Sequence, residues 1–133
     1  MSAKPAASNR PLSPFMIGPY YRPQITSMLS ITHRATGVVL AIGTLFLAAW
    51  LLCAAAGPQA YSTWLWLAGG IGGKVLMFGW SWALLYHLCN GIRHLVWDTG
   101  RAFTLEAVTR GGIIVVASSI VLTIAVWVLA FAV

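Results

Sequence analysis

Residues 87–98 read HLCNGIRHLVWD and close a long apolar segment with a polar run. His87 belongs to the apolar part, and at a helical rise of about 1.5 Å per residue it lies roughly 10 Å deeper along the axis than His94. An imidazole at that depth in a membrane is costly without a partner, and metal ligation is its most specific use. Gly91 is one turn away on the same helix face, where the missing side chain leaves room for a flat, bulky cofactor. The pattern predicts a haem site at His87, with a histidine hydrogen-bonded between helices as the alternative.

The composition is that of an integral membrane protein. Of the 133 residues, 59% are hydrophobic and 8% are charged, and three apolar runs are each long enough to cross a bilayer. The net charge of +6 does not indicate nucleic-acid binding, because the basic groups are spread among the apolar runs and form no phosphate-binding face. The sequence therefore predicts an all-α membrane protein with three transmembrane helices, at about residues 27–56, 64–96 and 110–133.

Basic residues predict the orientation of these helices. They precede the first apolar run (Lys4, Arg10, Arg22 and Arg34), separate the second from the third (Arg93, Arg101 and Arg110), or stand at the start of the second (Lys74). By the positive-inside rule, the N-terminus and the second connection are cytoplasmic and the C-terminus is outside.

Two domains are expected. Residues 1–26 form a Pro-rich cytoplasmic tail, because each proline disfavours helix in the residue before it, and residues 27–133 form the membrane anchor. The tail has neither the apolar core of a secretory signal nor the features of a transit peptide. This predicts a bacterial inner membrane, with a processed mitochondrial chain as the alternative.

Several smaller features refine this picture. Glycines 69, 70, 72 and 73 allow either a close approach of another helix or a hinge. Cys53 and Cys89 are expected near opposite membrane faces, so both should be free thiols. No Cys-x-x-Cys-His occurs, which argues against a covalently attached c-type haem.

The second axial ligand of a six-coordinate haem iron is expected from another chain. His33 precedes the hydrocarbon stretch and His94 lies two helical turns nearer the same surface, so neither is expected at the depth of His87. The chain is therefore predicted to share a haem with another chain.

Ser30, His33 and Arg34 stand at the start of the first apolar run. Ser30 and Arg34 are four apart and share a helix face, while His33 points roughly 100° away from Arg34. One face could bond a neutral carbonyl-bearing ligand, and the other an anionic group such as a haem propionate. Alternatively, Arg34 only snorkels to the membrane surface.

Arg93 and His94 offer a further contact at the same level. A guanidinium can bind a propionate bidentately. His94 could instead pair with Asp98, four residues on, as a structural end to the helix. The role of His94 stays open between these two.

These residues carry a resemblance to the cytochrome b large membrane-anchor subunits of succinate dehydrogenase (complex II). Residues 22–37, RPQITSMLSITHRATG, resemble that family's Ser-x-x-His-Arg-x-Ser/Thr-Gly signature with its Arg-Pro-rich leader. Residues 87–98 are similar to its His-x-x-x-Gly-x-Arg-His signature on the second helix, and Lys74 also matches bacterial members. The agreement extends over nearly the whole chain.

The resemblance implies roles for single residues. His87 matches the axial ligand of haem b, whose second ligand is a histidine of a small membrane-anchor subunit. The resemblance thus implies that this chain is half of a heterodimeric haem-binding helical bundle. Ser30 and Arg34 match residues that line the ubiquinone pocket. Positions around the haem and its propionates are matched by His33, Arg34, Gly91, Arg93 and His94.

The implied function is anchoring of succinate:ubiquinone oxidoreductase in the lipid membrane. This chain would be a non-autonomous enzyme subunit, with FAD and iron–sulfur clusters only in its partners, the flavoprotein and iron–sulfur subunits. Two alternatives remain at this stage. One is the anchor of a quinol:fumarate reductase, and the other is a haemless structural or transport membrane protein.

Overall fold

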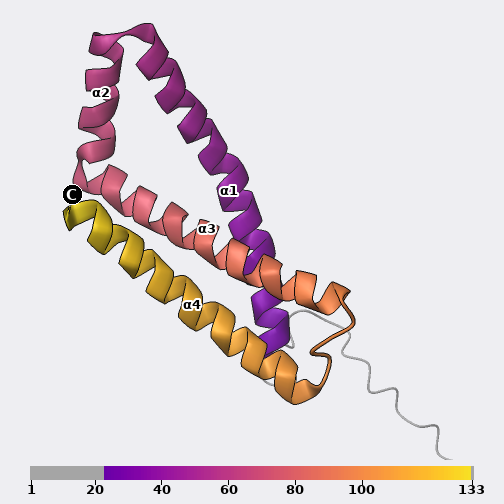
Figure 1. The fold of residues 1–133 in the computed structure, drawn as a ribbon. Coiled ribbons are helices and arrows are strands. Elements are labelled where there is room, and N and C mark those ends of the chain that lie inside the picture. Colours follow the sequence, from indigo (N-terminus) through magenta and orange to yellow (C-terminus); the bar gives the residue numbers. More distant parts are fainter. Residues whose placement is uncertain (1–22, 133) are drawn as a thin grey trace, which may run out of the picture.

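The computed structural model describes residues 23–132, which form four helices. They are α1 (Ile25–Ala56), α2 (Pro58–Gly69), α3 (Ile71–Asp98) and α4 (Leu105–Ala132). Figure 1 shows α3 and α4 running antiparallel side by side, with α1 crossing them and α2 connecting the far end of α1 to the start of α3. The predicted Pro-rich tail lies almost wholly outside the described residues.

Two of these helices, α1 and α4, are long and apolar enough to cross a membrane. At 1.5 Å per residue their 32 and 28 residues extend about 48 and 42 Å, beyond a hydrocarbon core of about 30 Å. Helix α3 also has 28 residues but is less apolar, because it carries Lys74 and the polar run at its end. Its crossing of the membrane stays a prediction.

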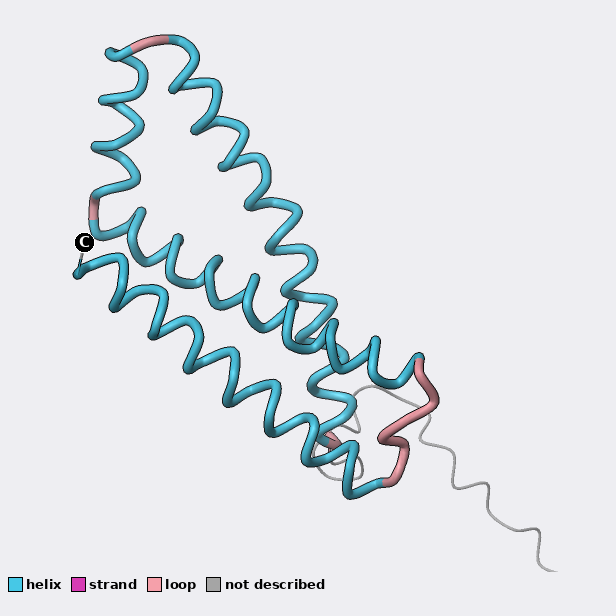
Figure 2. The backbone as a smooth tube through the Cα atoms, in the orientation of Figure 1, coloured by secondary structure: helices cyan, strands magenta, loops and turns pink. Residues whose placement is uncertain are grey.

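The second predicted segment, 64–96, is not one continuous helix. Figure 2 shows loops after α1 and between α2 and α3, where the chain turns. Gly57 has a φ of 109°, which favours glycine, and Pro58 begins α2 because its missing N–H is not needed there. The extended backbone of Gly70 then separates α2 from α3. The glycine cluster thus contains the break between two helices, and it is tightly packed, since a Cβ on Gly73 would collide with the carbonyl of Ala68.

The contact between α1, α3 and α4 is small and specific. Leu29, Tyr86 and Val115 form its apolar core, one from each helix, and the Tyr86 hydroxyl donates a 3.1 Å hydrogen bond to the Leu29 carbonyl. Helix α4 faces its neighbours with small residues spaced three or four apart, namely Gly112, Val115, Ser119 and Thr123. Most other large apolar side chains are exposed, as expected where lipid or another subunit covers them.

Both cysteines are free, as predicted. The hydroxyls of Ser119 and Thr123 donate to carbonyls of their own helix, at 2.9 and 2.7 Å, so helix packing accounts for them.

Candidate functional site

The rings of His33 on α1 and His87 on α3 are stacked. Their centroids are 3.8 Å apart and their planes differ by 14°. The prediction that His33 lies shallower than His87 is therefore wrong, because it compared positions along separate helices and ignored how α1 crosses α3. His94 is also near, with its ring centroid 5.4 Å from that of His33. All three histidines of the chain thus belong to one cluster.

The hydrogen bonds of His87 determine its tautomer. Its Nδ1 lies 3.2 Å from the main-chain oxygen of His33 and 3.2 Å from the Thr36 hydroxyl oxygen. A carbonyl oxygen can only accept, so Nδ1 bears the hydrogen and donates it. The Thr36 hydroxyl donates its own hydrogen to the same carbonyl at 2.9 Å, which leaves its oxygen free to accept from His87. Neutral His87 therefore carries its lone pair on Nε2, the atom available to a metal.

Two glycines set the space around this imidazole. A Cβ on Gly37 would lie 3.2 Å from Cε1 of His87, so the absence of a side chain lets α1 approach the ring closely. A Cβ on Gly91 would have no atom of the described residues within 4 Å. No atom of the described chain covers α3 at Gly91, and the role predicted for this glycine beside a cofactor stays a prediction.

His94 and Arg93 make contacts that sequence spacing did not predict. The amide nitrogen of Asn90 lies 3.5 Å from His94 Nε2, and its oxygen accepts a 3.4 Å bond from Arg93. No ion pair joins His94 to Asp98 in the described part of the chain, where the one ion pair is Arg110–Glu106. The alternative of a His94–Asp98 helix end is therefore not realised.

Arg93 points toward α4 rather than toward the histidines. It donates a 3.0 Å bond to the Val108 carbonyl, and its guanidinium lies 4.1 Å over the Trp97 ring. Six residues along a helix rotate it about 120° from His87. A guanidinium held by these contacts is directed away from the histidine cluster, which argues against the predicted role of Arg93 at a haem propionate.

Ser30 and Arg34 lie in the first turns of α1, Ser30 half-buried and Arg34 exposed. The single ion pair within residues 23–132 does not include Arg34, so its charge is available to a ligand. The two residues are one helical turn apart, as the spacing predicted.

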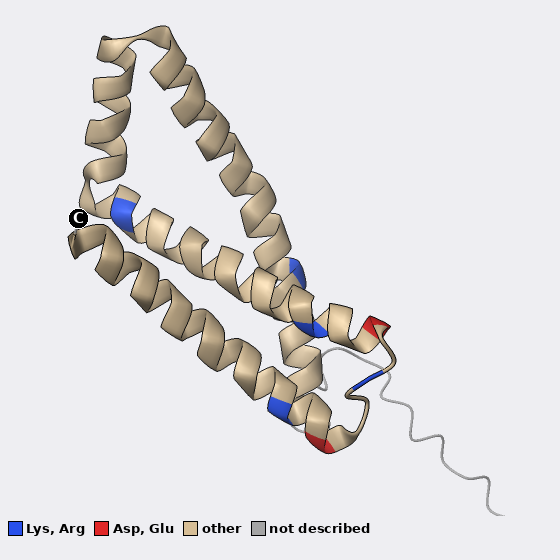
Figure 3. Cartoon of the chain, viewed as in Figure 1, with Lys and Arg blue, Asp and Glu red and all other residues tan. Residues whose placement is uncertain are grey.

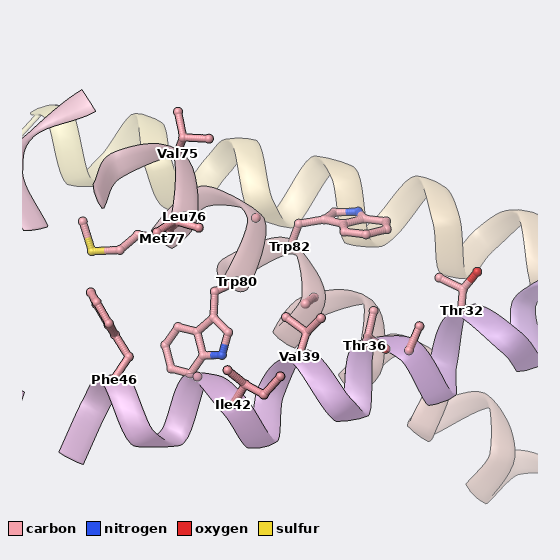
Figure 4. A pocket seen from close by; sticks show the side chains of 14 residues that line it. Thr32, Thr36, Val39, Ile42, Phe46, Val75, Leu76, Met77, Trp80 and Trp82 are labelled. Carbon is pink, nitrogen blue, oxygen red and sulfur yellow. The ribbon is translucent and has the colours of Figure 1, made fainter. Parts of the chain in front are cut away.

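An apolar cavity of about 580 Å³ lies between α1 and α3, next to this cluster. Figure 4 shows its side chains, which run along α1 from Thr32 and Thr36 to Phe46 and face Trp80 on α3. The indole of Trp80 occupies the place that a side chain on Gly43 would take, and its N–H is buried without a partner. Thr36 also lines this cavity, so His87 and the cavity share a wall.

The donor set suits a haem better than a chelated metal ion. Within the described residues, no group of three or more His, Cys, Asp or Glu side chains converges on a point that could hold a metal. Stacked rings cannot place their nitrogens on opposite sides of one ion. What the structure offers is one imidazole with a free Nε2, open space at Gly91, and a buried Nδ1 on His33 that has no partner.

Comparison with known proteins identifies the family. The profile described as succinate dehydrogenase/fumarate reductase transmembrane subunit matches residues 6–126. The chain belongs to this family. The cytochrome b556 subunit of succinate dehydrogenase from Rickettsia prowazekii is 42% identical over 121 residues, covering 91% of this chain and 93% of the relative.

Two further relatives agree with this membership. The cytochrome b556 subunit of Paracoccus denitrificans succinate dehydrogenase is 34% identical, over 87% of this chain and 88% of its own length. The mitochondrial cytochrome b560 subunit of Sus scrofa is 40% identical, over 84% of this chain and 66% of its own length. Membership of a transmembrane-subunit family agrees with the apolar exposed surface of α1 and α4.

Sequence reasoning missed several residues that shape the site. Thr36 and Gly37 lie within the quoted motif but were given no role, although they contact His87 directly. Asn90 is fully buried and bridges Arg93 and His94. The sequence did offer a signal for Asn90, because it lies between His87 and His94, which share one face of α3.

Proposed function

We propose that this chain is the cytochrome b membrane-anchor subunit of a succinate:ubiquinone oxidoreductase. It would hold haem b through His87 and form part of the ubiquinone-reduction site with Ser30 and Arg34. The observation that carries this proposal is the His87 Nδ1 bond to the His33 carbonyl, at 3.2 Å, which leaves Nε2 free for iron. The names of the relatives, all succinate dehydrogenase subunits, favour succinate oxidation over fumarate reduction.

The haem-binding part of the proposal uses the histidine cluster. His87 would be the axial ligand, held in orientation by Thr36 and the His33 carbonyl. Gly91 would leave space beside the ligand, while His33, His94 and Arg34 would bind the propionates. When bound, haem b supplies a site that stores one electron. The second axial histidine would come from a small membrane-anchor subunit, because His33 is stacked on His87 and cannot reach the opposite face.

The quinone-binding part uses the first turns of α1. Succinate would be oxidised at FAD in a flavoprotein subunit, and an iron–sulfur subunit would deliver the electrons to ubiquinone, which also takes up two protons. The Arg34 guanidinium would polarise a quinone carbonyl and stabilise the negative charge that develops on it. The Ser30 hydroxyl would bond to the same ring.

The proposed orientation places this site on the cytoplasmic side of a bacterial inner membrane. Figure 3 shows the cations of α1 and α4 and one of the two on α3, Arg93, toward one end, with Lys74 at the other end of α3. The positive-inside rule assigns the first end to the cytoplasm. The chain would then cross the membrane three times, by α1, α3 and α4. Because one relative is mitochondrial, the mitochondrial inner membrane remains the alternative location.

Purification through an affinity tag on this chain tests the proposal. We expect flavoprotein and iron–sulfur polypeptides to copurify, together with a b-type cytochrome that succinate reduces. A chain that purifies alone, or with partners but without haem, would contradict it.

A further inference from the structure

Arg93 is a buried charge without a carboxylate partner. Its exposed fraction is 9%, and its three contacts, with Asn90, Val108 and Trp97, are all with neutral groups. The single ion pair of the described residues is elsewhere. A desolvated guanidinium without a counter-charge is destabilising, so an anion close to it would be favoured.

One donor of this guanidinium is also unused. The Nε of Arg93 is buried and has no hydrogen-bond partner. It lies 3.5 Å from the position that a Cβ on Gly111 would take. Both residues line a cavity of about 200 Å³ between α3 and α4. Gly111 therefore brings no side chain against this charged N–H, and the cavity adjoins both residues.

The surroundings combine cations with an apolar surface. Ile92, Val96 and Ile114 line the same cavity and are 53%, 42% and 61% exposed. Trp97 stacks on the guanidinium, and its indole donates to the Ala102 carbonyl at 3.2 Å. Arg101 is exposed on the connection, and Arg110 is exposed on the first turns of α4, where it is paired with Glu106. An oxyanion attached to hydrocarbon chains matches both parts of this surface.

We propose that the cavity between α3 and α4 binds the phosphate of an anionic phospholipid through Arg93, with its acyl chains along Ile92 and Ile114. Basic pockets between membrane helices commonly recognise such headgroups. This site lies on the face of α3 turned toward α4, whereas His87 faces α1. The proposal needs the membrane location but not the haem, so it can fail without the proposed function failing.

Gly111→Ala is the sharpest variant for this site. The new methyl group would stand 3.5 Å from Nε, where a phosphate oxygen at about 2.9 Å would have to lie. The contact itself is ordinary van der Waals packing, and alanine favours helix over glycine, so the chain should still fold. Gly72→Ala is the matched control, because nothing of the described chain lies within 4 Å of its Cβ.

The test uses the intact purified complex after delipidation in detergent. Phosphatidylglycerol, phosphatidylcholine or inorganic phosphate is titrated while lipid retention is measured by native mass spectrometry and stability by thermal unfolding. We expect saturable stabilisation by phosphatidylglycerol, a loss of about tenfold in apparent affinity in Gly111→Ala, as for one charge-assisted hydrogen bond, and no change in Gly72→Ala.

Four outcomes would overturn the proposal. Phosphatidylcholine could match phosphatidylglycerol, or Gly111→Ala could bind as tightly as the parent. Inorganic phosphate alone could reproduce the whole effect, which would indicate a site for a free oxyanion. Finally, a structure of the complex could show a carboxylate of a partner subunit bound to Arg93 Nε in place of a lipid phosphate.

Discussion

The imidazole of His87 and the main-chain carbonyl of His33 are joined by a 3.2 Å hydrogen bond between α3 and α1. This bond does more than connect two helices. It fixes which nitrogen of His87 carries hydrogen, and it does so with a main-chain atom that substitution of His33 would not remove. The Thr36 hydroxyl adds a second acceptor at the same nitrogen.

Thr36→Val removes that second acceptor while conserving side-chain volume. A hydrogen bond to Nδ1–H makes the imidazole a stronger electron donor, so its loss should raise the midpoint potential of a haem held by His87. One neutral hydrogen bond corresponds to a rise of about 20–60 mV for one electron. Redox titration of the purified complex measures it. Thr44→Val is the control, because Thr44 bonds only to Ala41 of its own helix, and equal shifts in both variants would contradict the assignment.

Gly37→Ala should disturb the orientation of His87. The added Cβ would lie 3.2 Å from Cε1, so the ring must move by a few tenths of an ångström. Overpacking of this kind costs about 1–3 kcal/mol. We expect lower haem content per complex and an altered low-spin signal in electron paramagnetic resonance. Gly72→Ala, which meets no atom within 4 Å, should leave both unchanged. An unaltered spectrum in Gly37→Ala would count against the close approach.

Arg34→Ala should depress ubiquinone reduction by roughly tenfold to hundredfold, because a charged donor to the quinone carbonyl is lost. Succinate oxidation coupled to a soluble dye should be nearly unchanged, since it does not need the membrane site. Arg101→Ala removes an exposed cation of the 99–104 connection and serves as the control. Ubiquinone reduction in Arg34→Ala that matches Arg101→Ala, with dye-coupled succinate oxidation intact, would refute the quinone assignment.

Tyr86→Phe tests the packing that supports the site. The Tyr86 hydroxyl is buried and donates to the Leu29 carbonyl at 3.1 Å, at the core of the three-helix contact. Its removal should destabilise the anchor by about 1 kcal/mol. Thermal unfolding of the complex should show a lower midpoint than the parent, whereas Tyr61→Phe on α2 should not. If both variants unfold alike, the bond does not contribute.

The sequence predicted the helical architecture well because apolar runs of membrane length report directly on helices. The bounds differ where local geometry intervenes: α1 begins at Ile25, α4 begins at Leu105, and Gly70 divides the 64–96 segment. Each of these depends on turn geometry and capping rather than on hydropathy. Neither the number of crossings nor their direction follows from the helices alone, so both stay predictions.

The site was predicted less completely, for a physical reason. Depth along a single helix is readable from sequence, but the angle at which α1 crosses α3 is not. That crossing, which Gly37 permits, brings His33 and Thr36 to the level of His87. The glycine and threonine were visible in the motif, yet only their contact with the imidazole shows what they do.

The central claim is that Nε2 of His87 binds haem iron, and a reduced-minus-oxidised optical spectrum of the purified complex tests it most directly. We expect a b-type band in the parent, its retention in His94→Ala, and its loss or clear shift in His87→Ala. Succinate oxidation by a soluble dye should persist in both variants and report assembly. An undiminished, unshifted band in assembled His87→Ala would contradict the account.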